Sequence, residues 1–314
     1  MQFRFMVAAS LVAFTLTAAA QLPDKPPTRP TITGISHIAV YTSNPAATEK
    51  FYLETVGAVK RPDPENPKGV RYALSATQFV EVLPLPDGAG INRLDHTAWN
   101  TDDAEAMRRY LGSKAWKVPG NVEKGTDGSR WFDIKDPEGN KVEFLQPPAV
   151  LKPVVAPNSI GQHIIHVGFV VHNRAFEDTF YRDLLGFKPY WFGGMTDTKV
   201  DWVSQQSPDS HDWLEYMIAG DPSGHGIPPD MSQHTLGVLD HFSIGEDSVP
   251  AAYKTLADGN RLNNGQHDDA PKIGKDGKYQ FNMYDPDGTR VEIMSFHATE
   301  KPCCSAFTAE DPAE

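Results

Sequence analysis

Two imidazoles and two carboxylates occur in the same order twice along this chain of 314 residues. The first series is His37, Glu81, His96 and Glu143, and the second is His166, Glu215, His241 and Glu292. Each residue lies in a short apolar run of the kind that forms strands. Two imidazoles and two carboxylates that converge on one point can hold a divalent metal and leave positions open for a substrate.

The donor types restrict the choice of metal. A mixed set of nitrogen and oxygen donors without sulfur suits Fe²⁺, Mn²⁺, Co²⁺, Ni²⁺ or Zn²⁺ rather than Ca²⁺. Two neutral imidazoles and two carboxylates also balance the charge of a divalent cation. A single histidine in an apolar strand is more often a packed side chain than a ligand, so the metal interpretation depends on the repetition of the series.

The residues around the two series repeat as well, which indicates a duplication. In two modules an aromatic pair begins fourteen residues after the histidine and a glycine lies twenty residues after it (His37, Phe51, Tyr52 and Gly57; His166, Phe180, Tyr181 and Gly186). In the other two modules Leu-Asp-His occurs at 94–96 and 239–241, and Asp-Pro-x-Gly-x-x-Val-Glu occurs at 136–143 and 285–292. The chain therefore contains four related modules.

Each module reads as a strand, a helix and about three further strands. The Asp-Pro-x-Gly segments are turn sequences, because proline fixes φ and glycine accepts a positive φ. Apolar residues at helical spacing predict the helices, which we expect at Ala47 to Val56, Asp103 to Leu111, Ala175 to Leu185 and Val249 to Leu256.

The remaining segments predict how the chain is divided. Residues 1–20 have the features of a secretory signal, with Arg4 before an apolar stretch and three alanines before Gln21, which predicts a secreted or periplasmic protein that begins at Gln21. We expect domains at 34–147 and 164–297, joined by a proline-rich linker at 148–163. Residues 298–314 form a polar tail that we expect to be frayed.

Charge and cysteine content narrow the function classes. The formal net charge is −12 without any basic cluster, which argues against nucleic acid and anionic membranes as partners. A small-molecule substrate is the expected partner, and a homodimer is compatible with the sequence. Cys303 and Cys304 are the only cysteines, they match no zinc motif, and adjacent cysteines pair only with strain, so we assign them no catalytic role.

This combination of modules resembles the vicinal oxygen chelate superfamily, which includes glyoxalase I, extradiol dioxygenases, fosfomycin-resistance proteins and bleomycin-binding proteins. The resemblance covers residues 34–146 and 164–296. It implies an α+β fold in which four βαβββ modules form two glyoxalase-like domains with cup-shaped mixed sheets. It also implies that all eight residues of the two series bind metal, and that Glu143 or Glu292 leaves the metal to act as a catalytic base.

Three functions remain open at this point. The first is a metal-dependent lyase or isomerase of the glyoxalase type, which uses the full ligand series. The second is an extradiol-type dioxygenase. The resemblance to those enzymes is incomplete, because they place a tyrosine ten residues before the last glutamate and this chain has Asn282 there. The third is a non-enzymatic protein that sequesters a metal or a small molecule.

The sequence favours the second half as the working half. Aromatic residues are more numerous around its predicted cup and can line an apolar pocket, although they suit a sheet core equally well; they are Tyr190, Trp191, Phe192, Trp202, Trp213 and Tyr216. The segment 220–238 reads as a long loop that can cover the cup. The resemblance adds that only one half is active in many two-domain members.

Overall fold

The computed structural model describes residues 26–88, 93–220 and 241–313. The predicted signal at 1–20 lies outside these residues, as does all but the first residue of the predicted cover at 220–238. Within the described ranges, no helix is both long and apolar enough to span a bilayer.

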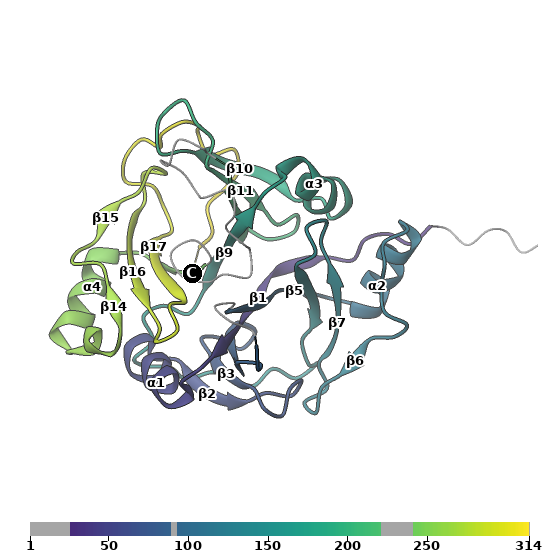
Figure 1. The fold of residues 1–314 in the computed structure, drawn as a ribbon, viewed down its shortest axis with the longest axis horizontal. Helices are drawn as coiled ribbons and strands as arrows, with labels where there is room; N and C mark the ends of the chain where they lie inside the picture. Colours follow the sequence, from purple (N-terminus) through teal and green to yellow (C-terminus); the bar gives the residue numbers. More distant parts are fainter. Residues whose placement is uncertain (1–25, 89–92, 221–240, 314) are drawn as a thin grey trace, which may run out of the picture.

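Two curled sheets dominate the molecule, one in each half (Figure 1). The first has eight strands in the order β2-β3-β4-β1-β5-β8-β7-β6, and the second has nine, with β10-β11-β12-β9-β13-β17-β16-β14 in order and β15 paired to β16. The predicted α+β fold of four βαβββ modules is therefore confirmed. The strands of the first sheet are β1 (Ile32–Thr42), β2 (Val59–Pro62), β3 (Val70–Ala73), β4 (Phe79–Pro84), β5 (Leu94–Thr101), β6 (Glu123–Lys124), β7 (Arg130–Lys135) and β8 (Lys141–Gln146).

The second sheet repeats the plan of the first. Its strands are β9 (Ile164–Val171), β10 (Lys188–Gly193), β11 (Trp202–Gln206), β12 (Trp213–Ile218), β13 (His241–Glu246), β14 (Gln266–His267), β15 (Lys272–Ile273), β16 (Tyr279–Tyr284) and β17 (Arg290–Ser295). In each half the first strands of two modules pair antiparallel, β1 with β5 and β9 with β13. Each of these strands pairs in parallel with the last strand of its own module. The four strands that carry the predicted ligands are thus the four central strands of each sheet.

All four predicted helices are present. They are α1 (Pro45–Lys50) followed by η1 (Phe51–Val56), α2 (Ala104–Ser113), α3 (Arg174–Asp178) followed by η2 (Thr179–Leu184), and α4 (Val249–Asp258), with a short 3₁₀ turn η3 (Arg261–Asn264). The aromatic pairs of modules one and three both lie in π-helical turns, which are rare and usually short. Gly57 and Gly186 follow these turns with φ of 80° and 84°, a conformation that favours glycine.

Side chains alternate along the central strands between the inside of the cup and the helix-covered core. On β12, Glu215 points to the cup side, and its neighbours Leu214 and Tyr216 belong to the main apolar core. Tyr216 packs against Phe169 and Tyr181, with ring centroids 6.4 and 6.1 Å apart. The prediction that Tyr216 lines the cup is therefore wrong, because the period of two along a strand sends it to the opposite face.

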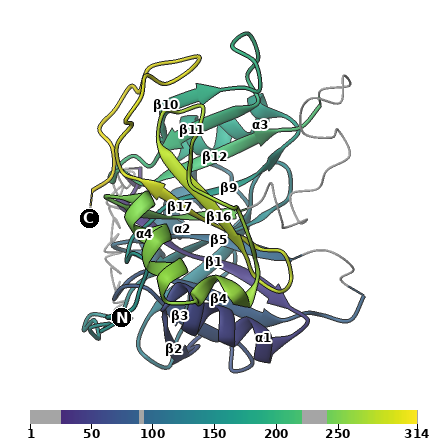
Figure 2. The same cartoon turned by 90° about the vertical axis from the view of Figure 1, so that its left-hand side faces the viewer.

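The two halves pack side by side, and each supplies a turn that binds the start of a helix in the other (Figures 1 and 2). The Asp287 carboxylate accepts hydrogen bonds from Thr42 Oγ1 at 2.9 Å and the Ser43 amide at 3.0 Å, just before α1. At the matching place, the Glu138 carboxylate accepts from the amides of His172 at 2.9 Å and Asn173 at 2.5 Å, just before α3. The duplicated Asp-Pro-x-Gly turns therefore hold the halves together.

The C-terminal tail is packed, which corrects the expectation of a frayed segment. Phe307 packs against Tyr190 with ring centroids 4.9 Å apart. Lys278 is fully buried, and its Nζ donates to Asp311 Oδ1 at 2.8 Å and to the Phe296 carbonyl at 2.6 Å. A buried ammonium needs such partners, so the tail is held in place by a charge that directly precedes β16 of the second sheet.

Candidate metal centres

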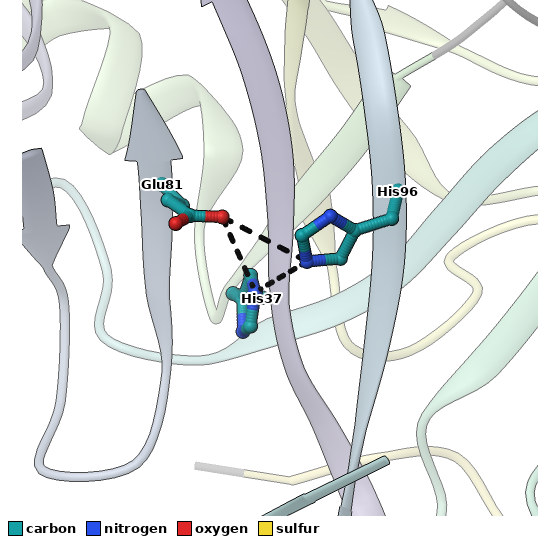
Figure 3. Close-up of side chains that lie close together, drawn as sticks. All are labelled: His37, Glu81 and His96. Carbon is teal, nitrogen blue, oxygen red and sulfur yellow. Dashed lines mark hydrogen bonds and ion pairs between the residues drawn. The ribbon is translucent and has the colours of Figure 1, made fainter. Parts of the chain in front are cut away.

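Four of the predicted ligands converge in the first cup, and we call them the first centre. Figure 3 shows three of them, His37, Glu81 and His96. The Nε2 atoms of His37 and His96 are 2.9 Å apart. Glu81 Oε2 lies 3.8 Å from His37 Nε2 and 3.7 Å from His96 Nε2. Glu143 completes the set, with Oε1 3.8 Å from His37 Nε2 and Oε2 3.5 Å from His96 Nε2.

The other four ligands converge in the same way in the second cup, and we call them the second centre. The Nε2 atoms of His166 and His241 are also 2.9 Å apart. Glu292 Oε2 lies 3.2 Å from His166 Nε2 and 3.6 Å from His241 Nε2. Glu215 Oε2 is 3.5 Å from His241 Nε2. The structure thus brings together all eight residues that the sequence singled out, in two sets of four.

The hydrogen bonds of the first centre fix which imidazole nitrogen is free to bind. His96 Nδ1 lies 2.7 Å from Asp95 Oδ2 and donates to that carboxylate, which leaves a lone pair on Nε2. Burial lowers the pKa of His37 well below its usual range, so this ring is neutral as well. Two neutral nitrogens that approach each other at 2.9 Å suit a shared cation, toward which both lone pairs can point.

The carboxylates of the first centre also fit a cation. Glu81 Oε2 and Glu143 Oε1 are buried and have no hydrogen-bond partner among the described residues. Burial raises the pKa of Glu81 to about 10 and that of Glu143 well above its usual range. A buried carboxylate without a partner is costly, and a divalent cation beside both would remove that cost.

The electrostatics of the second centre differ between its two glutamates. Burial raises the pKa of Glu215 to about 8. Burial also opposes ionisation of Glu292, but the hydrogen bond with His166 and the charge of Arg290 outweigh it and lower the pKa of Glu292. His166 Nδ1 is buried without a hydrogen-bond partner in the described part of the chain. Because the pKa values of these two neighbouring carboxylates shift in opposite directions, Glu292 stays ionised and Glu215 takes up a proton readily.

The surroundings of the first centre hold charged residues that the sequence analysis did not predict. Across β3 and β4, Arg71 pairs with Glu81. Arg71 Nε donates to Asp63 Oδ1 at 3.2 Å, and its Nη2 binds Glu65. These residues have no matching charged set among the described residues of the second half, so a search based on the repeat could not find them.

The second centre has small or neutral neighbours at the matching places. Ser204 pairs with Glu215 across β11 and β12, and Asn282 pairs with Glu292 across β16 and β17. Trp213 lies against His166, with ring centroids 4.6 Å apart. The Glu215 side chain keeps 15% of its surface exposed, whereas that of Glu81 keeps 3%. The second centre is therefore the more exposed of the two at this glutamate, while its other three ligands are buried.

A third group of metal-capable side chains lies at the surface, where Asp197 approaches Cys303 and Cys304. The structure joins the two cysteines in a disulfide. Sequence reasoning assigned them no catalytic role, and they lie in the tail rather than on the central strands of either cup.

Comparison with protein families gives a match in each half. The model of the Glyoxalase/Bleomycin resistance protein/Dioxygenase superfamily matches residues 34–144 and 156–293. No curated protein sequence matches the chain.

Solved structures of similar fold include dioxygenases and a glyoxalase. The 2,3-dioxygenase LapB from Pseudomonas sp. KL28 has a TM-score of 0.62 and 14% identity, over 85% of this chain and 93% of that chain. A catechol 2,3-dioxygenase has a TM-score of 0.60 and 16% identity, over 90% and 92%. The Mn(II)-bound glyoxalase from Novosphingobium aromaticivorans has a TM-score of 0.63 and 17% identity, over 85% and 83%. At such identities the similarity is one of fold.

Proposed function

Since the chain belongs to the Glyoxalase/Bleomycin resistance protein/Dioxygenase superfamily, we propose that it is a divalent-metal-dependent enzyme of the glyoxalase type. It carries out lyase or isomerase chemistry on a small compound with two adjacent oxygen atoms. The reaction takes place at the second centre. His166, Glu215, His241 and Glu292 would hold Fe²⁺, Mn²⁺, Co²⁺, Ni²⁺ or Zn²⁺ there.

The observation that carries this proposal is the fourth donor. Glu215 Oε2 lies 3.5 Å from His241 Nε2, so two carboxylates and two imidazoles converge instead of two imidazoles and one carboxylate. When bound, the cation acts as a Lewis acid toward the substrate oxygens. The second carboxylate supplies a proton acceptor beside the same point, which proton transfer requires and oxygen activation does not.

Two glutamates are candidates for the base. Sequence reasoning gave this role to Glu292, as it did to Glu143 in the first half. In the second centre Glu292 is tied to His166 at 3.2 Å and is almost fully buried, whereas Glu215 is more exposed. We therefore propose that Glu215 meets the substrate first and that Glu292 keeps His166 oriented.

A second candidate function is extradiol ring cleavage, favoured by the two-cup architecture shared with the dioxygenases LapB and catechol 2,3-dioxygenase. The position expected to carry tyrosine holds Asn282, whose Nδ2 donates to Asp268 Oδ2 at 2.8 Å. A side chain engaged in this way has no phenol to offer a substrate. We therefore rank this function second.

We also propose the remaining properties expected from the sequence. The protein is exported through residues 1–20 and acts outside the cytoplasm on a small molecule, without nucleic acid or membrane partners. N-terminal sequencing of protein recovered from the extracytoplasmic fraction should begin at Gln21, and size-exclusion chromatography should tell a monomer from a homodimer.

The test of function is a turnover assay on protein loaded anaerobically with each of the five metals. A panel of hemithioacetals, α-hydroxy carbonyl compounds and catechols is offered with and without oxygen. Turnover that needs the metal but not oxygen, and that Glu215→Gln reduces more than Glu292→Gln, supports the proposal. Turnover that consumes oxygen supports ring cleavage instead, and metal binding without turnover on any member supports sequestration.

A further inference from the structure

We propose that the first centre is a closed, structural cation site from which substrate is excluded by the chain's own side chains Asp63 and Glu65. This goes beyond the proposed reaction. It rests on the proposed metal binding but not on which reaction the second centre performs.

A buried cluster of three charged side chains caps the first centre. Asp63 and Glu65 follow β2, and Arg71 on β3 binds both of them. The side chains of all three keep 10% or less of their surface exposed. Glu65 also reaches the ligand Glu143, and Asp63 reaches the ligand Glu81. The cluster therefore touches the carboxylate ligand on each side of the centre.

The space that remains in the first cup lies away from the ligands. A cavity of about 270 Å³ is lined by Arg71, Phe79, Leu145 and residues of the linker such as Val154. No ligand of the first centre lines it. Phe79 stacks on His37 with ring centroids 4.3 Å apart, and Arg71 lies 4.1 Å from the Phe79 centroid. This stack forms a wall between the cavity and the centre, so a molecule in the cavity meets Arg71 and Phe79 rather than the ligands.

The buried side chains around the first centre also carry more acidic than basic groups. Asp63, Glu65, Glu81 and Glu143 are four buried carboxyl groups, and Arg71 bears the guanidinium placed among them. If all ionise, three negative charges remain uncompensated in a region from which water is excluded. Buried charge of this size requires a cation or protons. A divalent ion at the first centre, where two carboxylate oxygens lack partners, meets that requirement and links the four central strands.

The second cup supports the inference by contrast. At the position of Arg71 it has Ser204, whose side chain is short and neutral. Among the residues of this half that the structure describes, no pair of carboxylates corresponds to the pair on Arg71. Among the eight ligands only the Glu215 side chain keeps 15% of its surface exposed and the others keep 4% or less, so the second centre is open at one ligand and the first is covered at all four.

The test uses Mn²⁺ as the probe and the relaxation rate of water protons as the readout, because this rate rises when water reaches a bound Mn²⁺. His241→Ala leaves the first centre intact, and His96→Ala leaves the second intact. We expect the enhancement per bound Mn²⁺ to be several-fold smaller in His241→Ala than in His96→Ala. In the wild type, a chelator should remove one equivalent of Mn²⁺ several-fold more slowly than the other.

Opening the cap should abolish the difference. In the His241→Ala background, Glu65→Ala should raise the relaxation enhancement toward the value of His96→Ala. The matched control is Ser204→Ala in the His96→Ala background, which should not change it. The inference is overturned if His241→Ala binds no Mn²⁺, if its enhancement equals that of His96→Ala, or if the wild type releases both equivalents at one rate. None of these readouts involves turnover, so failure to find a reaction leaves them valid.

Discussion

The two halves of this protein place the same four donors on the same four central strands, yet they differ in the residues one strand further out. In the first half Arg71 faces Glu81 and brings Asp63 with it. In the second half Ser204 faces Glu215. The central strands therefore decide whether donors converge, and the neighbouring strands decide whether anything else can approach them.

Substituting one metal-ligand histidine in each half should have the largest effects and tests this comparison most severely. His241→Ala should lower kcat/KM by at least about 100-fold, because loss of even an outer partner of a metal ligand costs about 10–100-fold. His96→Ala should act mainly on the melting temperature and reduce turnover far less. Steady-state kinetics on metal-loaded protein, with the exposed His211→Ala as control, provide the measurement. Equal losses of turnover in the two ligand variants would show that the halves share the reaction.

Removing the charge that caps the first centre should cost stability. Arg71→Met leaves Asp63 and Glu65 buried without their cation, and breaking a buried ion pair in this way costs about 3–5 kcal/mol. Denaturant unfolding of the metal-free protein measures the loss. Arg109→Met removes an exposed partner of Glu105 and should cost less than about 1 kcal/mol. A cost for Arg71→Met as small as that of the control would mean that the cap carries little energy.

The tail of the second half offers a smaller effect. Asp311→Asn takes the negative charge away from the buried ammonium of Lys278 and should destabilise the protein by about 1–3 kcal/mol. The neighbouring Glu310 is exposed, and Glu310→Gln should change the stability by less than about 0.5 kcal/mol. Thermal unfolding of both variants gives the comparison.

A pH-dependent effect is expected at the position where the halves carry Thr48 and Glu177. Burial, with the charges of Asp136 and Glu138, raises the pKa of Glu177 to about 9. The folded state therefore keeps a proton that the unfolded state releases near pH 4.5. By linkage, the stabilisation that protonated Glu177 gives the folded state is fully present below about pH 4.5 and is lost as the pH rises towards 9.

Glu177→Gln keeps an oxygen acceptor for the Glu138 amide and removes this loss. The melting temperature of the variant minus that of the wild type should therefore increase from pH 5 to pH 9. Thr48→Ser, at the matching place in the first half, should give a difference that does not vary with pH. A difference for Glu177→Gln that shrinks with rising pH would contradict the assignment.

Sequence reasoning reached the fold and the donor sets because both are repeated. The duplicated Asp-Pro-x-Gly turns and the matched His and Glu positions mark the ends and centres of strands, and strand geometry then forces convergence. It missed Asp63, Glu65 and Arg71, because they occur in one half only and their contacts depend on how far a loop folds over the cup. It also placed Tyr216 on the wrong face and left the tail unpacked, because neither strand facing nor the partner of Lys278 is written in local composition.

The crossed turns at Glu138 and Asp287 have a consequence for how this chain can be divided. Each half completes the hydrogen bonding of the other at the entrance to a helix, through amides that would otherwise be left without a partner. Neither half is therefore a self-sufficient unit, and cutting the chain at the linker would expose polar backbone on both pieces at once. A structural change in the first half that moves Glu138 therefore also affects the start of α3 in the second half, and this coupling opposes the loss of the covered first centre.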